Sequence, residues 1–316
     1  MTVLLARTAG RLYWGARYVE RAEDTARIVR AYNDLVVDYP SDELLRWEPL
    51  AVIAGSHVVV DVPETDPAGE FTVLRHLLAD RSAGSSIASS VAAARENFRT
   101  TREVMPREAW QAINQLSQYV DATATGAVDR QLRDRFLLRV VEISRRLDGI
   151  LESTMTRSEP YRIIRLGRLV ERADMTTRVL GVAAAGILSL ESVDRPDLVI
   201  DEVRWMSVLR SVSALQMYQR ATRGPIDAVA VVRFLLEYGA FPRSVRGCLD
   251  EIRQVTEGLP RPAMILEALD EADAALAAAR PGGEGGAELD RSMQVVQRAI
   301  AHLGDIICRL YVDVVT

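Results

Sequence analysis

The sequence contains no lysine, so all 39 residues counted as lysine or arginine are arginines. This absence excludes a Walker-type phosphate-binding lysine, a Schiff-base lysine and a lysine general base. Histidine is also scarce: His57, His76 and His302 are far apart, and none follows an acidic residue at the spacing that di-iron helical bundles use. We therefore expect no metal site.

Cysteine and long apolar runs are scarce too. Cys248 and Cys308 have neither metal-ligand nor disulfide-framework spacing, which is typical of reduced thiols in a cytosolic protein. The first 21 residues lack the apolar core of a signal peptide because they contain Arg7, Arg11, Arg17 and Arg21. The longest apolar run, 179–190, is too short to span a bilayer. We expect a cytoplasmic protein without membrane contact.

The composition that remains favours helices. Hydrophobic residues make up 48% of the 316 residues but aromatics only 6%, so the apolar content is mostly leucine, valine and alanine. The formal net charge is −5, with both signs interleaved along the chain. No basic block marks a nucleic-acid-binding protein, and we expect no such partner.

Apolar residues recur at helical spacing through most of the chain, which predicts an all-α fold. We expect helices at about 8–38, 86–103, 106–120, 128–155, 160–190, 201–222, 227–236, 243–257, 263–279 and 287–314. Proline- and glycine-rich stretches predict connectors at Asp61–Gly69, Glu191–Asp197, Gly258–Pro262 and Pro281–Gly286. The segment His57–Val62 could form a short strand, but without a nearby partner strand we interpret it as an extended loop.

A repeated motif indicates an internal duplication. Seven positions between Val19 and Arg27 recur between Val170 and Arg178 at an offset of 171 − 20 = 151, and six are identical. Two further blocks repeat in the same order at offsets of 158 and 156. We predict an internally duplicated helical bundle with pseudo-twofold related halves, 1–157 and 158–316, packed as one domain.

The repeated motif places charges on one helix face. Arg17, Glu20, Arg21, Asp24 and Arg27 lie on one arc of a helical wheel, and the second copy is Arg168, Glu171, Arg172 and Arg178, with Met175 replacing the acid. The spacing would let Glu20 contact Arg17, Asp24 or Arg27 on its own helix. A solvated face is one interpretation. Retention of the motif in both halves favours a buried network on helices that face each other.

Three functional hypotheses follow from this face. The surplus of arginine favours an anionic ligand, because guanidinium groups hold carboxylates at two points. Alternatively, Glu20 or Glu171 could act as a catalytic general base, although neighbouring arginines would lower its pKa. The third hypothesis is a purely structural scaffold in which the pairs only fix helix packing.

Other polar groups are candidates for the same ligand. Arg95 and Asn97 lie on a predicted helix of the first half, and Arg157 precedes the second repeated motif. Arg243 and Ser244 fall at a predicted helix start, where exposed N–H groups also accept anions. Each of these could equally be an ordinary surface or capping residue.

With these motifs the sequence resembles the Alpha-E family, a bacterial helical domain with a Glu-Arg motif. The resemblance spans nearly the whole chain and rests on separated motifs that include Tyr13-Trp14, Val19-Glu20-Arg21-Ala22-Glu23, Trp47-Glu48-Pro49-Leu50, Ala94-Arg95-Glu96-Asn97, Thr154-Met155-Thr156-Arg157, Leu169-Val170-Glu171-Arg172-Ala173-Asp174 and Phe241-Pro242-Arg243-Ser244. Gly84 and Tyr161 depart from the residues that the family favours, and both are tolerable packing changes.

The resemblance implies a function in peptide synthesis or modification. The family is associated with circularly permuted ATP-grasp proteins and with transglutaminase-like proteases. We therefore expect an accessory subunit that partners an ATP-grasp ligase and helps to bind a carboxylate-bearing peptide or amino-acid substrate, with a transglutaminase-like protein as a second candidate partner. No cofactor is expected on this chain itself, because ATP and Mg are implied only through the ligase.

Overall fold

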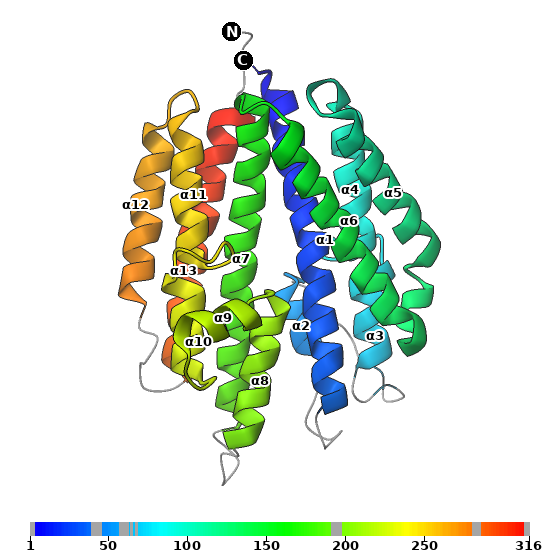
Figure 1. Ribbon diagram of the computed structural model, residues 1–316, viewed down its shortest axis with the longest axis vertical. Coiled ribbons are helices and arrows are strands. Elements are labelled where there is room, and N and C mark those ends of the chain that lie inside the picture. Colours follow the sequence, from blue (N-terminus) through cyan, green and yellow to red (C-terminus); the bar gives the residue numbers. More distant parts are fainter. Residues whose placement is uncertain are drawn as a thin grey trace.

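Two long helices run through the middle of the molecule. In the computed structural model α1 (Ala6–Asp38) and α7 (Glu159–Leu190) lie side by side (Figure 1). The structure describes residues 4–38, 46–56, 69–190, 198–279 and 286–312, together with Pro63 and Asp66. Over these residues the chain forms helices and turns and no strand, so the all-α prediction is confirmed.

Three long helices flank each central helix. Against α1 pack α4 (Ile87–Arg99) and α6 (Arg130–Thr154), with α5 (Arg107–Thr123) outside them. Against α7 pack α11 (Val245–Glu257) and α13 (Gly286–Ile307), with α12 (Ala263–Ala278) outside. Figure 1 shows these two groups on opposite sides of the central pair. The core is therefore continuous across the molecule.

The other helices of the described residues lie near one end of the bundle (Figure 1). They are α2 (Glu48–Ile53), α3 (Glu70–Leu74) with a π-helical turn at Arg75–Ala79, α8 (Leu198–Ser211), α9 (Leu215–Thr222) and α10 (Ala228–Glu237). Of these, α2 packs on α7 and α8 packs on α1. Single 3₁₀ turns occupy Arg102–Val104 and Gly126–Val128, and a π-helical turn at Cys308–Val312 contacts α1.

Serine residues begin two of the flanking helices. The Ser86 hydroxyl accepts a hydrogen bond from the Ser89 N–H at 3.0 Å at the start of α4. The Ser244 hydroxyl accepts one from the Gly247 N–H at 2.9 Å at the start of α11. Each bond satisfies a backbone N–H that has no partner within its helix. The prediction of a helix start at Ser244 is confirmed.

Two predicted helices need correction, and two short helices were not predicted. The predicted helix 201–222 is wrong: α8 ends at Ser211 and α9 begins at Leu215, because Ser213 has a φ of 55° that a right-handed helix cannot contain. The predicted helix 287–314 gives way to a π-helical turn after Ile307. The helices α2 and α3 were not predicted, since they are too short to show a period. The segments His57–Val62 and Glu191–Asp197 lie outside the described residues.

The central helices approach each other closely at a glycine. A Cβ atom on Gly167 would lie 2.4 Å from the Tyr13 carbonyl oxygen and 3.3 Å from the Ala16 Cβ. Only glycine allows the two backbones to come this near. The close approach brings the charged faces of α1 and α7 into contact. Within the described part of the chain, no helix is both long and apolar enough to cross a membrane.

Candidate functional site

The repeated Glu-Arg motifs contact each other across the central interface. Glu171 of α7 accepts hydrogen bonds from Arg17 Nε at 2.7 Å and Arg21 Nε at 2.5 Å, both on α1. Glu171 is 1% exposed. The carboxylate of one motif is thus held by the arginines of the other.

The reverse contact joins Glu20 of α1 to the arginines of α7. Arg168 Nε and Arg172 Nε donate to the Glu20 carboxylate at 3.0 and 2.8 Å, and Glu20 is fully buried. The prediction that Glu20 contacts neighbours on its own helix is therefore wrong, because its carboxylate points across the interface. We call Arg17, Glu20, Arg21, Arg168, Glu171 and Arg172 the Glu–Arg network.

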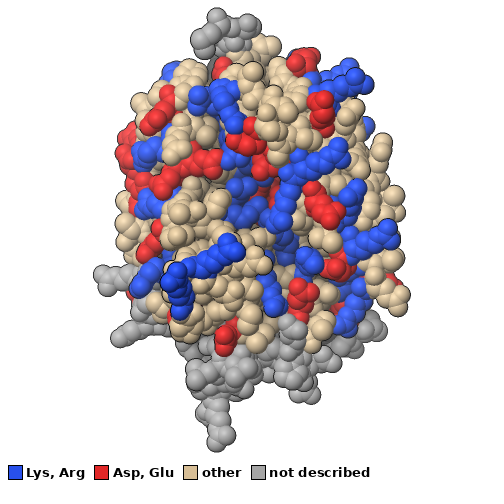
Figure 2. Space-filling model, viewed as in Figure 1, with Lys and Arg blue, Asp and Glu red and all other residues tan. Residues whose placement is uncertain are grey.

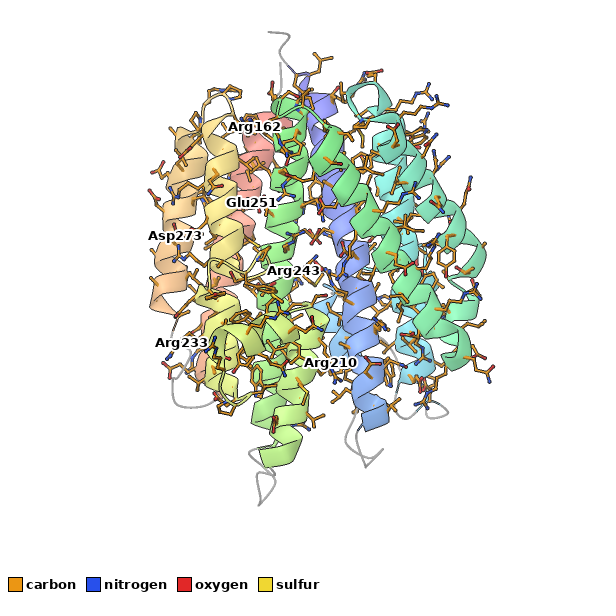
Figure 3. All side chains as sticks on the ribbon, in the orientation of Figure 1. Arg162, Arg210, Arg233, Arg243, Glu251 and Asp273 are labelled. Atoms are coloured by element: carbon orange, nitrogen blue, oxygen red, sulfur yellow. The ribbon has the colours of Figure 1, made fainter. Side chains whose placement is uncertain are left out.

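The network has two ends: the Glu20 end, where Glu20 meets Arg168 and Arg172, and the Glu171 end, where Glu171 meets Arg17 and Arg21. The Glu20 end includes further charged residues. Arg243, next to the cap of α11, reaches Glu20 at 3.0 Å and Asp24 at 2.9 Å through Nη1. Arg27 Nη1 donates to Glu23 at 2.6 Å and also pairs with Asp24. Figure 3 places Arg243 near the middle of the molecule, beside α7 and α1. Arg243 therefore connects α11 to the central helices.

Electrostatics keep the two glutamates of the network ionised. Burial opposes ionisation of Glu20, but Arg172, Arg168 and Arg243 outweigh it and hold the pKa well below its ordinary value. For Glu171, burial is likewise outweighed by Arg17 and Arg21, and the pKa is lowered. Burial, and then repulsion from Arg27 and Arg172, lower the pKa of Arg243 to about 10. The Glu20 end is thus crowded with positive charge.

These pKa shifts predict a loss of stability in acid. The folded-state pKa values of Glu20, Glu171 and Glu23 are lowered, so their contribution is complete above the ordinary glutamate pKa of about 4.3 and is lost as pH falls below it. Burial raises the pKa of Asp24, which offsets part of this loss. We expect urea midpoints to fall between pH 5 and 3, and the Glu20→Gln variant to lose less over this range. An equal loss in the wild type and in Glu20→Gln would contradict a contribution of Glu20 to this pH dependence.

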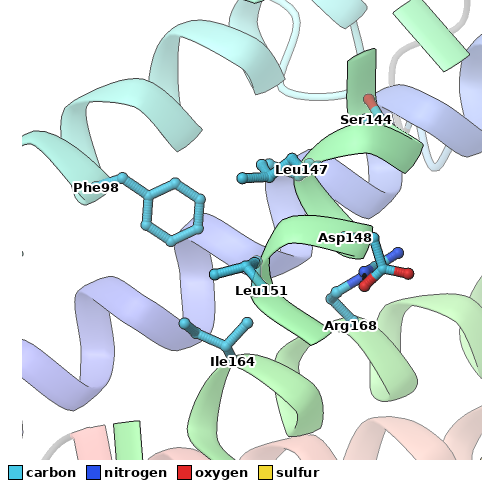
Figure 4. Close-up of a pocket in the computed structure, with 9 residues that line it drawn as sticks. Phe98, Ser144, Leu147, Asp148, Leu151, Ile164 and Arg168 are labelled. Atoms are coloured by element: carbon cyan, nitrogen blue, oxygen red, sulfur yellow. Dashed lines mark ion pairs between the residues drawn. The ribbon is translucent and has the colours of Figure 1, made fainter. Parts of the chain in front are cut away.

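A small cavity lies beside the Glu20 end. Its walls are mainly apolar, with Phe98, Leu147, Leu151 and Ile164, while Asp148 and Arg168 form an ion pair at its edge (Figure 4). The cavity has a volume of about 10 Å³, which is room for about one water molecule. The cavity is too small for an amino acid, so we do not assign the substrate to it.

The other candidate residues lie apart from the network. Arg95 donates to Asn114 at 2.8 Å, Asn97 donates to the Ala93 carbonyl at 2.9 Å, and Arg157 pairs with Glu152 at 2.6 Å on the surface. Arg178 pairs with Asp174 at 2.9 Å. The Ser244 hydroxyl is buried in its helix cap. The structure thus brings Arg243 to the Glu–Arg network but not Arg95, Asn97 or Arg157.

Two residues at the Glu20 end, Asp148 and Arg165, were not predicted from the sequence. Asp148 of α6 pairs with both Arg168 and Arg165, and Arg165 also pairs with Glu251 of α11. The spacing of Arg165, Arg168 and Arg172 places all three on one face of α7, which was an available signal. Nothing in the sequence near Asp148 indicated which helix it would meet.

The surface over this region carries both signs of charge. Figure 2 shows basic side chains gathered near the middle of one face, with acidic and basic side chains interleaved around them. The described residues include no group of three or more histidine, cysteine, aspartate or glutamate side chains placed to hold a metal ion. The chemistry of the site is therefore that of arginine–carboxylate pairing.

The fold and site define an all-helical protein with Glu-Arg motifs paired across its centre. The model of the Alpha-E family, described as a predicted alpha-helical domain with a conserved ER motif, matches residues 4–312. The chain belongs to the Alpha-E family. No curated protein and no solved structure matches it.

Proposed function

We propose that the chain is a non-catalytic accessory subunit of an ATP-dependent peptide-forming system, and that its Glu–Arg network holds the two halves in a fixed arrangement. The proposal that the network fixes the two halves rests on one observation. Arg168 and Arg172 are only 4% and 7% exposed, and both donate hydrogen bonds to the fully buried Glu20. Such pairs fix geometry, since removing one partner leaves a buried charge unpaired.

The pKa values favour this function over a stand-alone enzyme. A general base works best when its pKa is near the working pH. The pKa values of Glu20 and Glu171 are lowered by the arginines around them, so both carboxylates are poor proton acceptors at neutral pH.

We further propose that the halves 1–157 and 158–316 arose by duplication and are related by a pseudo-twofold axis. The reciprocal pairing of the two motifs supports this, as each motif is both donor and acceptor. The helices α4 and α11 are both 13 residues long, and serine caps both at the offset of 244 − 86 = 158. The link between α6 and α7 contains the proposed boundary.

The partner assignment rests on the Alpha-E resemblance. An ATP-grasp ligase would supply ATP, Mg and the bond-forming chemistry, and a transglutaminase-like protein could act in the same system. This chain would help to hold a peptide or amino-acid substrate by its carboxylate. Its arginine content supports that role, because guanidinium groups recognise carboxylates at two points.

Co-purification from the native host tests the proposal. We expect the tagged chain to bring an ATP-grasp ligase with it, identified by mass spectrometry, and a tag-only sample to bring none. Peptide formation by the recovered complex, followed as ADP release, should fall when the chain is removed. Recovery of the tagged chain alone, from cells that contain the ligase, would contradict the partnership.

A further inference from the structure

We propose that the Glu171 end of the Glu–Arg network binds a carboxylate of the substrate, in the position that Asp148 occupies at the Glu20 end. The inference deepens the proposed function and rests on it for the biological role of the ligand. The binding itself is a property of this chain alone. It follows from a difference between the two ends of the network.

The Glu20 end is closed by additional charged groups. Arg168 pairs with both Glu20 and Asp148, and Arg243 pairs with Glu20 and Asp24. Arg168, Arg172 and Arg243 thus meet four carboxylates, those of Glu20, Glu23, Asp24 and Asp148. The side chains of Arg168 and Arg172 are only 5% and 8% exposed. Asp148 demonstrates that one of these arginines can hold a second carboxylate beside the glutamate.

Three of the corresponding positions at the Glu171 end carry no charge, whereas Glu23 is matched by Asp174 (23 + 151), which pairs with Arg178. The offsets of the repeat match Asp148 with Gly304 (148 + 156), Arg243 with Ser85 (243 − 158) and Asp24 with Met175 (24 + 151). Arg17 and Arg21 therefore meet a single carboxylate, Glu171, among the described residues. Their side chains are 15% and 21% exposed, so solvent reaches them more readily than it reaches Arg168 and Arg172.

Gly304 faces the groups that would hold a carboxylate. A Cβ atom there would lie 3.8 Å from Arg17 Nη1 and 3.5 Å from the Tyr13 hydroxyl, both ordinary contact distances. Tyr13 is fully buried, and its hydroxyl proton has no acceptor within the described residues, while the Arg17 guanidinium lies close to the hydroxyl oxygen. Burial raises the pKa of Tyr13, so the hydroxyl keeps its proton and can donate it. A carboxylate above Gly304 would accept from both groups.

Aromatic rings hold the two arginines in place. The Cζ atom of Arg17 lies 4.9 Å from the centre of the Trp14 ring, and that of Arg21 lies 5.5 Å from the Tyr18 ring. Stacking covers the guanidinium faces and leaves their N–H edges for hydrogen bonds. Because a Cβ atom at Gly304 would already meet its neighbours at ordinary contact distances, the site suits the flat carboxylate of an amino acid or peptide better than the larger phosphate.

Acetate serves as the probe for the full-length protein. We expect calorimetric titration at constant ionic strength to detect acetate binding by the wild type. Gly304→Asp supplies an internal carboxylate and should weaken acetate binding about tenfold or more, as expected for a lost charge-assisted contact. The matched control Gly304→Ala adds a methyl group without charge and should stay within about twofold of the wild type.

Tyr13→Phe provides a second test that adds no volume. Loss of one hydrogen-bond donor should weaken acetate binding about fivefold. This variant decides the question if Gly304→Asp does not fold, as judged by circular dichroism. An unchanged affinity in Tyr13→Phe, equal weakening by Gly304→Ala and Gly304→Asp, or tighter binding of inorganic phosphate than of acetate would each overturn the proposal.

The outcome is separable from that of the proposed function. If acetate binds as expected but no ligase co-purifies, the carboxylate site stands and the partnership fails. If the ligase co-purifies but the wild type does not bind acetate, the partnership stands and this site is wrong.

Discussion

Replacing Glu20 with glutamine should lower the free energy of unfolding by about 3–5 kcal/mol, the range found when one partner of a buried ion pair is removed. Glutamine keeps the size of the side chain but leaves Arg168, Arg172 and Arg243 without their shared carboxylate. These guanidinium groups are too deeply buried to recover the loss from water. Urea denaturation followed by circular dichroism at pH 7 measures the change.

The matched control removes a carboxylate from the surface. Glu142 pairs with Arg139 at 3.1 Å, and both side chains are about half exposed, so Glu142→Gln should change stability by less than about 1 kcal/mol. Glu171→Gln should cost less than Glu20→Gln, because Arg17 and Arg21 reach solvent. A Glu20→Gln protein as stable as the Glu142→Gln control would refute the structural function of the network.

Replacing Gly167 with alanine should destabilise the protein by about 1–3 kcal/mol, the usual cost of overpacking. The added Cβ would lie 2.4 Å from the Tyr13 carbonyl oxygen, so α1 and α7 must move apart. A backbone atom cannot rotate away as the end of a side chain can. The separation would also lengthen the contacts between the two motifs, and urea denaturation would detect the combined loss.

Gly149 offers a control at a second helical glycine. It lies on the exposed side of α6, and an added Cβ would meet nothing within 4 Å. Gly149→Ala should therefore stabilise the protein by about 0.5–1 kcal/mol, because alanine is the better helix former. If both alanine variants were stabilised equally, the close approach at Gly167 would be absent in solution.

The sequence predicted the long helices and the faces that carry the network. The repeat of Glu20-Arg21 as Glu171-Arg172 indicated a buried network, because a solvated face has no reason to keep the same residues twice. It also pointed to two helices that face each other. What it could not provide was the partner of each charge. A helical wheel gives directions around one axis and says nothing of the helix opposite.

The residues that were misplaced illustrate the same limit. Arg95 and Asn97 share the polar character of the network residues, but their side chains bond to Asn114 and to the Ala93 backbone. Asp148 looked like any surface acid on α6, and only the structure shows that it pairs with Arg168 of α7. Whether a charged residue joins the network depends on which helix lies opposite it in the folded protein. In a single sequence, only the repeated motif carried that information.

The central pairs join residues that are distant in the chain, and this has a consequence for synthesis. The hydrogen bonds of Glu20 and Glu171 connect positions 148 to 154 residues apart. At 5–20 residues per second, roughly 8–30 s pass between translation of α1 and translation of its partner on α7. During that time the carboxylate of Glu20 and the arginines beside it lack the α7 partners that they contact in the folded protein. The nascent first half therefore exposes a charged stripe that the finished molecule encloses.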